Sequence, residues 1–359
     1  MSCGISEAPA GAHLRQRAGR RRGILVSLCL SLLLLVGGVA AWAGPGGGSG
    51  GSSQPVAFSG QATVVRANVL GVPIVLADTG PLPAAGGAQN ASLLEADELG
   101  LLSAKVLHAA TIGQGDRSRS EASVADLNLV VGGHTIAAEF LMARAMAVCG
   151  PRGPVTSGSS DIALLTIDGQ PIAVTGAPNQ RIALPVGEVI INEQTTQSSK
   201  HYGSITVNAL HVVIPGVADV VIASAHADIT CSGKPVCRGG DFVTGGGWIV
   251  TDSGSRANFA VAGGIRNGSF WGHLNYIDHG TSLKVKGTGV TAYVVTGPTS
   301  RHIEGTCEIN GVPGTYMVDV ADEGEPGRGR DGFRITLSMG YTAGNTLAGG
   351  NVQLHRPCK

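Results

Sequence analysis

The chain has 359 residues, including 56 glycines, with 25 basic and 25 acidic side chains. Beyond residue 43 the balance becomes slightly acidic, with 20 basic and 24 acidic side chains, which argues against nucleic acid or an anionic membrane as partner. Glycine is about twice its average share of roughly 7%. Short Val, Ile, Thr and Ala runs broken by Gly, Asn and Pro favour many short strands.

The N-terminal segment has the pattern of a secretory signal peptide. Five arginines between Arg15 and Arg22 precede an apolar run from Ile24 to Val36, and Ala41-Trp42-Ala43 has the A-x-A pattern of a cleavage site. We therefore predict a signal peptide at 1–43, a Gly/Ser-rich linker at 44–55, and export. An uncleaved anchor is the alternative, because residues 24–43 are about long enough to span a bilayer.

The first half of the mature chain predicts a series of strands. Apolar and polar residues alternate in Ser123–Val130, and Asp168-Gly169 between two apolar runs predicts a tight hairpin. Ile205–Ile214 and Val221–Cys231 continue the series. Ser92–Leu102 is ambiguous, since its Leu, Glu and Ala favour helix, but the all-β context favours strands.

A boundary is expected near residues 232–235, after which the strand pattern restarts. Asn310-Gly311 predicts a second hairpin, although Pro313 and Gly314 suggest a longer loop there. Phe333–Met339 presents one apolar face. The predicted fold is all-β, with two antiparallel β-sandwich-like domains at 56–232 and 237–359 following the signal peptide and the linker.

Several motifs resemble those of a known family of exported bacterial proteins. They are the runs Asp241–Ile249, Gly272–Tyr276, Asp278-His279, Gly324–Gly327 and Gly349–His355 in the second half, and Thr206–Val212 and Ala225–Cys231 in the first. The first half resembles the choice-of-anchor P family, and the second resembles the small C-terminal domain that commonly follows it. The resemblance implies an exported bacterial protein and carries no known chemistry.

The sequence predicts no catalytic residue and no cofactor. Matches to nucleophile-elbow and dinucleotide-binding patterns fall in glycine-rich segments such as Gly47–Gly51 and Gly327–Gly332, where chance matches are expected. His273 and His279 share a strand face but lie roughly 20 Å apart in an extended strand. They are therefore expected to be hydrogen-bonded polar residues rather than zinc ligands.

An acidic loop is the best candidate for binding a cation. Asp319, Asp322, Glu325 and Asp331 are closely spaced in a Gly-rich turn, and carboxylates of this kind suit the flexible oxygen coordination of calcium. A possible calcium site is therefore predicted there. The alternative is a solvated turn whose acids are neutralised by Arg328 and Arg330.

Five cysteines follow residue 43, and an exported protein is expected to pair them. Cys149 and Cys231 each end a predicted strand and are expected to form one disulfide, closing a loop of about 80 residues. Cys237–Cys358 is the second expected pair, because it would join the two ends of the second domain. Cys307 would then remain unpaired.

The predicted function is that of a non-enzymatic, secreted protein with an extracellular structural, surface-layer or adhesive role. A cell-envelope component or an extracellular polymer is the expected partner, with no membrane span after signal cleavage. The alternative is a carbohydrate- or matrix-binding module that uses Trp248, Trp271 and Tyr276. A metal-dependent extracellular enzyme ranks third, since no nucleophile, base and orienting group occur together.

Overall fold

The computed structural model describes residues 56–98, 100–231 and 240–356. Within these ranges the regular structure consists of strands alone, so the predicted all-β fold class is confirmed. No helix long and apolar enough to cross a membrane occurs among the described residues. The predicted signal peptide and linker lie outside them.

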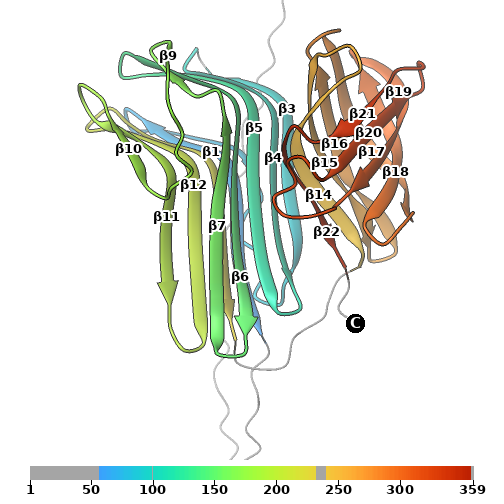
Figure 1. Ribbon diagram of the computed structural model, residues 1–359, viewed down its shortest axis with the longest axis horizontal. Helices are drawn as coiled ribbons and strands as arrows, with labels where there is room; N and C mark the ends of the chain where they lie inside the picture. The colour runs from blue at the N-terminus through green and yellow to red at the C-terminus, as the bar shows by residue number, and fades with distance from the viewer. Residues whose placement is uncertain (1–55, 99, 232–239, 357–359) are drawn as a thin grey trace, which may run out of the picture. The chain divides into compact units, whose positions relative to one another are not determined.

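The strands of the first half form two antiparallel sheets (Figure 1). The first sheet contains, in spatial order, β10 (Gln180–Ala183), β11 (Glu188–Ser198), β12 (Tyr202–Ile214), β13 (Ala218–Thr230), β1 (Ala57–Val69) and β2 (Val72–Asp78). The second, which we call the central sheet, contains β3 (Gly87–Glu98), β4 (Leu102–Gln114), β5 (Arg117–Val131), β6 (His134–Gly150), β8 (Thr166–Ile167) and β9 (Gln170–Pro171), with β7 (Gly153–Ala163) also paired to β6. The two sheets pack face to face over a core that includes Leu107, Leu141, Val207 and Ile222.

The second half forms a nine-stranded antiparallel sheet, which we call the C-terminal sheet. Its spatial order is β21 (Thr342–Thr346), β20 (Gly332–Leu337), β19 (Val312–Ala321), β18 (Ser300–Ile309), β17 (Leu283–Val295), β16 (Ser269–Asp278), β15 (Arg256–Arg266), β14 (Phe242–Val250) and β22 (Gly349–His355). The sheet curls around its own core, so that Phe259 of β15 stacks on Phe333 of β20 with ring centroids 4.0 Å apart. No described strand of this half pairs with a strand of the first half.

The central sheet is covered on both faces, because its second face packs against the C-terminal sheet. Phe140 and Trp248 meet across this interface with centroids 4.8 Å apart. The Gly245–Gly247 run of β14 allows the close approach: a Cβ on Gly246 would lie 2.5 Å from Ser123 Oγ. Strands β4 and β5 are consequently buried on both faces over much of their length.

The hairpin predictions separate into one confirmed and one corrected in detail. Asp168 and Gly169 have positive φ and join β8 to β9, as predicted. Asn310 and Gly311 also form a two-residue turn, so the longer loop was wrong. Pro313 is tolerated because it forms the second pair from the turn, opposite Glu308, where backbone N–H groups point away from the partner strand.

Two further segments were expected to be strands. Ser92–Leu102 does contribute to β3 and β4, which confirms the choice of strand over helix. The Phe333–Met339 prediction was too long: β20 ends at Leu337, and Met339 lies in the following turn with 64% of its surface exposed. Phe333, Ile335 and Leu337 do face the core.

Candidate functional site

A pocket of about 440 Å³ lies where the central sheet meets the C-terminal sheet. Strand register determines its floor, because residues paired across neighbouring strands share one face of the sheet. Two adjacent rows line up in this way: Ile112, Arg119, Met146 and Ser157 form the first, and Glu121, Arg144 and Ser159 form the second. Four strands of the central sheet thus present two arginines and one glutamate to the same cavity.

The opposite wall comes from the C-terminal sheet. Thr244 of β14 and both Gln353 and His355 of β22 line it, together with Glu325-Pro326 from the loop between β19 and β20. Each of these residues lies at least 100 positions after the arginines of the floor. The pocket therefore exists only because the two halves of the chain pack together.

A chain of buried hydrogen bonds runs behind the pocket. His108 is fully buried, and its Nε2 lies 3.2 Å from Glu121 Oε1, while its Nδ1 lies 3.2 Å from His273 Nε2. The Thr244 hydroxyl donates to the same Glu121 oxygen at 3.1 Å and lies 3.1 Å from His355 Nε2. These contacts join the two sheets through Glu121, which is only 6% exposed.

Burial keeps the outer histidines of this chain neutral. It lowers the pKa of His273 to about 3, and the nearby His108 adds to the effect. Burial, reinforced by the positive charge of Arg119, also holds the pKa of His355 well below its usual value. Because the Thr244 hydroxyl donates its proton to Glu121, its oxygen must accept from the Nε2–H of His355. The hydroxyl therefore has no free base to activate it.

Arg119 is the least satisfied charge in the pocket. Its Nε is buried without a hydrogen-bond partner, and no carboxylate among the described residues lies within ion-pair distance of its guanidinium. Burial and repulsion from Arg117 lower the pKa of Arg119. Arg144 is better compensated, since its Nη1 lies 3.5 Å from Glu325 Oε2, although that nitrogen also lacks a hydrogen bond.

The four carboxylates of the predicted calcium site are each occupied by protein groups. Asp331 is fully buried, and its two oxygens accept hydrogen bonds from the backbone N–H groups of Glu323, Gly324 and Val352. Burial raises the pKa of Asp331 to about 6, against these donors, which favour the ionised form. Asp322 accepts from the backbone of β22 at 2.8 Å. Both residues therefore tie the acidic loop to a strand.

The other two carboxylates point to different partners. Asp319 Oδ1 lies 2.7 Å from His302 Nδ1, whereas Glu325 faces Arg144 at the rim of the pocket. No cluster of three or more metal-ligating side chains occurs in the described part of the chain. The described carboxylates face separate protein partners, which favours the alternative of a turn without a bound cation, and calcium binding itself stays a prediction to be tested.

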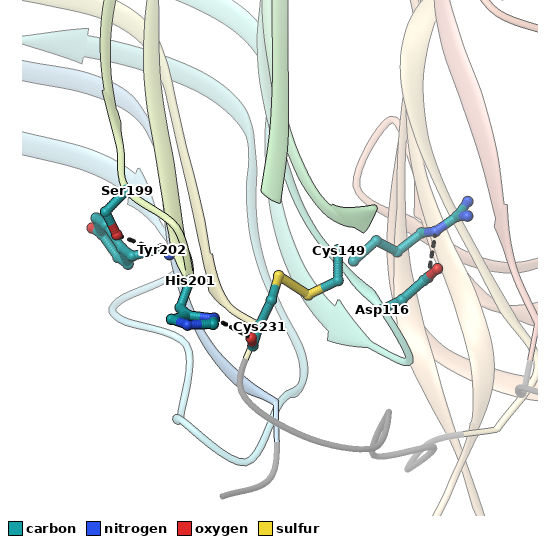
Figure 2. Close-up of a disulfide and its surroundings, with 7 residues drawn as sticks. Asp116, Cys149, Ser199, His201, Tyr202 and Cys231 are labelled. Atoms are coloured by element: carbon teal, nitrogen blue, oxygen red, sulfur yellow. Dashed lines mark hydrogen bonds and ion pairs between the residues drawn. A yellow bond between two sulfur atoms is a disulfide. The ribbon is translucent and has the colours of Figure 1, made fainter. Parts of the chain in front are cut away.

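The cysteines form one disulfide among the described residues, and it is the expected pair (Figure 2). Cys149 is the second-to-last residue of β6 in the central sheet, and Cys231 follows β13 of the first sheet, with Cα atoms 5.6 Å apart. The bond therefore joins the two layers of the sandwich. Cys307 is a buried free thiol in β18. The expected Cys237–Cys358 pair lies outside the described residues.

The aromatic residues of the carbohydrate-binding alternative do not form an exposed platform. Tyr276 is fully buried inside the C-terminal sheet, where its hydroxyl lies 2.7 Å from that of Tyr341. Trp248 and Trp271 are half-buried and pack in the interface with the central sheet. The burial of Tyr276 removes that ring from a binding surface, and the carbohydrate-binding alternative itself stays a prediction.

Among the residues that line the pocket, Glu325 was predicted from the sequence as a candidate site residue, and the arginines of the floor were not. The only local signal was the alternation of charged residues with serine in Arg117-Ser118-Arg119-Ser120-Glu121, which places both arginines and the glutamate on one strand face. An exposed charged face is the ordinary interpretation of such a pattern. His273 and His279 are hydrogen-bonded polar residues, as expected.

The chain matches no known family model and no curated protein. A crystal structure described as a "putative AttH" from Nitrosomonas europaea is similar over 84% of this chain and 93% of that one, with 9% identity and a TM-score of 0.19. A structural similarity with so low a TM-score supports no conclusion about fold or function. The resemblance to the choice-of-anchor P family stays a prediction.

Proposed function

We propose that this chain is an exported, non-enzymatic protein that binds a component of the cell envelope or an extracellular polymer, in an adhesive or structural role. The pocket between the central and C-terminal sheets carries this proposal. Its volume falls within the range typical of small-ligand sites, and it combines apolar walls with a few converging polar groups. The inter-sheet disulfide supports an oxidising location such as the outside of the cell.

The same geometry favours binding over catalysis. Thr244 is the hydroxyl nearest to a histidine in the pocket, but it is 1% exposed and already donates its proton to Glu121. A nucleophile needs both access to substrate and a base that accepts its proton. His355 cannot serve as that base, because its Nε2–H donates to the Thr244 hydroxyl.

A pocket-filling substitution tests the proposal. Ser159→Phe, on β7, places a large ring in the cavity, whereas Val155→Phe lies on the same strand face but outside the pocket. We expect binding of the purified protein to cell-envelope material and to glycan arrays to be lost in the first variant and kept in the second. Equal binding by both variants would remove the pocket from the function.

Export has its own test. We expect the protein recovered from culture medium to begin at or near Gly44, since the A-x-A pattern ends at Ala43. Edman sequencing or intact mass measurement determines the N-terminus directly. A membrane-bound product that retains residues 24–43 would show that the segment is an anchor.

A further inference from the structure

The positive charge of Arg119 has no carboxylate within ion-pair distance among the described residues. Glu121 Oε1 is taken by His108 and by the Thr244 hydroxyl. The Nε of the Arg119 guanidinium is buried without an acceptor, which is unfavourable because burial removes water from this donor without replacing it. Its presence in a cavity indicates that an acceptor from outside the chain completes the site.

Nearby carboxylates limit how much negative charge that acceptor carries. Glu325 faces Arg144 at 3.5 Å and accepts a hydrogen bond from Asn351, so these groups form a separate, nearly neutral cluster at the rim. Glu121, Glu325 and Asp322 all lie close enough to act on the charge of Arg119. A ligand with two negative charges is repelled by these acids more than a ligand with one.

Polar groups for the rest of the ligand surround this position. Ser157, Ser159 and Gln353 line the pocket and make no side-chain hydrogen bonds to other described residues. Ile112 and Met146 supply apolar surface beside them. Sugar rings use both kinds of contact, because their hydroxyl groups form hydrogen bonds at the rim and their C–H groups pack against apolar side chains.

We propose that the pocket binds the carboxylate of a hydroxylated acid of the uronic-acid type, with Arg119 as its anchor. The inference rests on the proposed function and identifies the ligand class for the same pocket. The planar guanidinium presents paired N–H donors that match a carboxylate, and the single charge of a uronate fits the acidic surroundings. Serine and glutamine side chains then hold the ring hydroxyls.

Calorimetric titration at fixed ionic strength tests the ligand class. The probes are D-glucuronate and D-galacturonate, matched with D-glucose and D-galactose, together with D-glucose 6-phosphate. We expect each uronate to bind at least about tenfold more tightly than its neutral sugar, as for one hydrogen bond to a charged group. Tighter binding of an oligogalacturonate than of the monomer would identify a polymer as the source, and equal binding would identify the free acid.

Two variants on β5 assign the effect to Arg119. Arg119→Gln should remove the preference for uronates, whereas Arg117→Gln, an exposed arginine on the same strand, should keep it. No binding of either uronate, tighter binding of the sugar phosphate, or unchanged uronate binding in Arg119→Gln would each overturn the proposal. If envelope binding is lost in Ser159→Phe but kept in Arg119→Gln, the proposed function stands and only the ligand class fails.

A stability measurement distinguishes a binding arginine from a structural one. Arg119→Met removes the unpaired cation and keeps an apolar side chain, so we expect the unfolding midpoint of the ligand-free protein to rise while the uronate-induced rise disappears. A lower midpoint in Arg119→Met would show that the arginine supports the fold, and would overturn its assignment as the anchor.

Discussion

The disulfide between Cys149 and Cys231 is expected to supply a large part of the stability of the sandwich. It links residues 82 apart in sequence. In the chain-entropy description, closing a loop of this length restricts the unfolded chain by about 4–5 kcal/mol. Its Cα separation of 5.6 Å falls within the usual range, so the bond forms without moving the strands.

The perturbation is the double substitution Cys149→Ala with Cys231→Ala. Urea unfolding followed by circular dichroism should show a free energy of unfolding that is lower by about 4–5 kcal/mol. A further contribution comes from packing, because both cysteines contact the apolar cluster of Phe58 and Ile229. The two sheets would then separate more readily, since the bond is a covalent link between β6 and the end of β13.

A reducing agent provides the control. With Cys237 and Cys358 both replaced by serine, so that no second disulfide can be reduced, it should destabilise the protein by a similar amount and leave the variant that also lacks Cys149 and Cys231 unchanged. A loss below about 1 kcal/mol would refute the loop-closure reasoning, because it is smaller than the chain-entropy term for even a short loop. A peptide map without reduction that joins Cys149 to any other cysteine would refute the pairing itself.

Three further predictions concern the buried polar groups and the packing between layers. Asp331→Asn should destabilise the protein by about 1–3 kcal/mol in urea unfolding, because its carboxylate serves three backbone N–H groups, and millimolar calcium should leave the natural protein's melting midpoint unchanged. Because burial lowers the pKa values of His273 and His355, these two residues bind fewer protons in the folded state than in the unfolded chain below about pH 6.5. The stability that they contribute should be complete above that pH and be lost as the pH drops towards 3, and His273→Gln should make this part of the acid decline shallower. Gly349→Ala should lower stability by about 1–3 kcal/mol or more, because its Cβ would lie 1.7 Å from the Trp248 ring; an unchanged midpoint would show that the ring moves freely.

The local features of this fold could be predicted from the sequence. Asp168-Gly169 and Asn310-Gly311 form their turns because Asn, Asp and Gly tolerate the positive φ that a two-residue hairpin requires. The apolar alternation of Phe333, Ile335 and Leu337 determined which face of β20 is buried. The Cys149–Cys231 pair followed from the positions of both cysteines at strand ends. The turn and face predictions depend on neighbours within a few residues, whereas the disulfide prediction joined two strand ends 82 residues apart.

The packing of one sheet against another decided the rest. Arg119 and His355 belong to the same pocket although 236 positions separate them, and no periodicity within either strand shows that they meet. The acidic loop has the composition of a calcium site, but Asp322 and Asp331 bond to backbone groups of the loop and of β22. Alternation identifies the two faces of a strand, whereas the partner of each face depends on which distant surfaces bury the most apolar area together. That choice is made only in the tertiary structure.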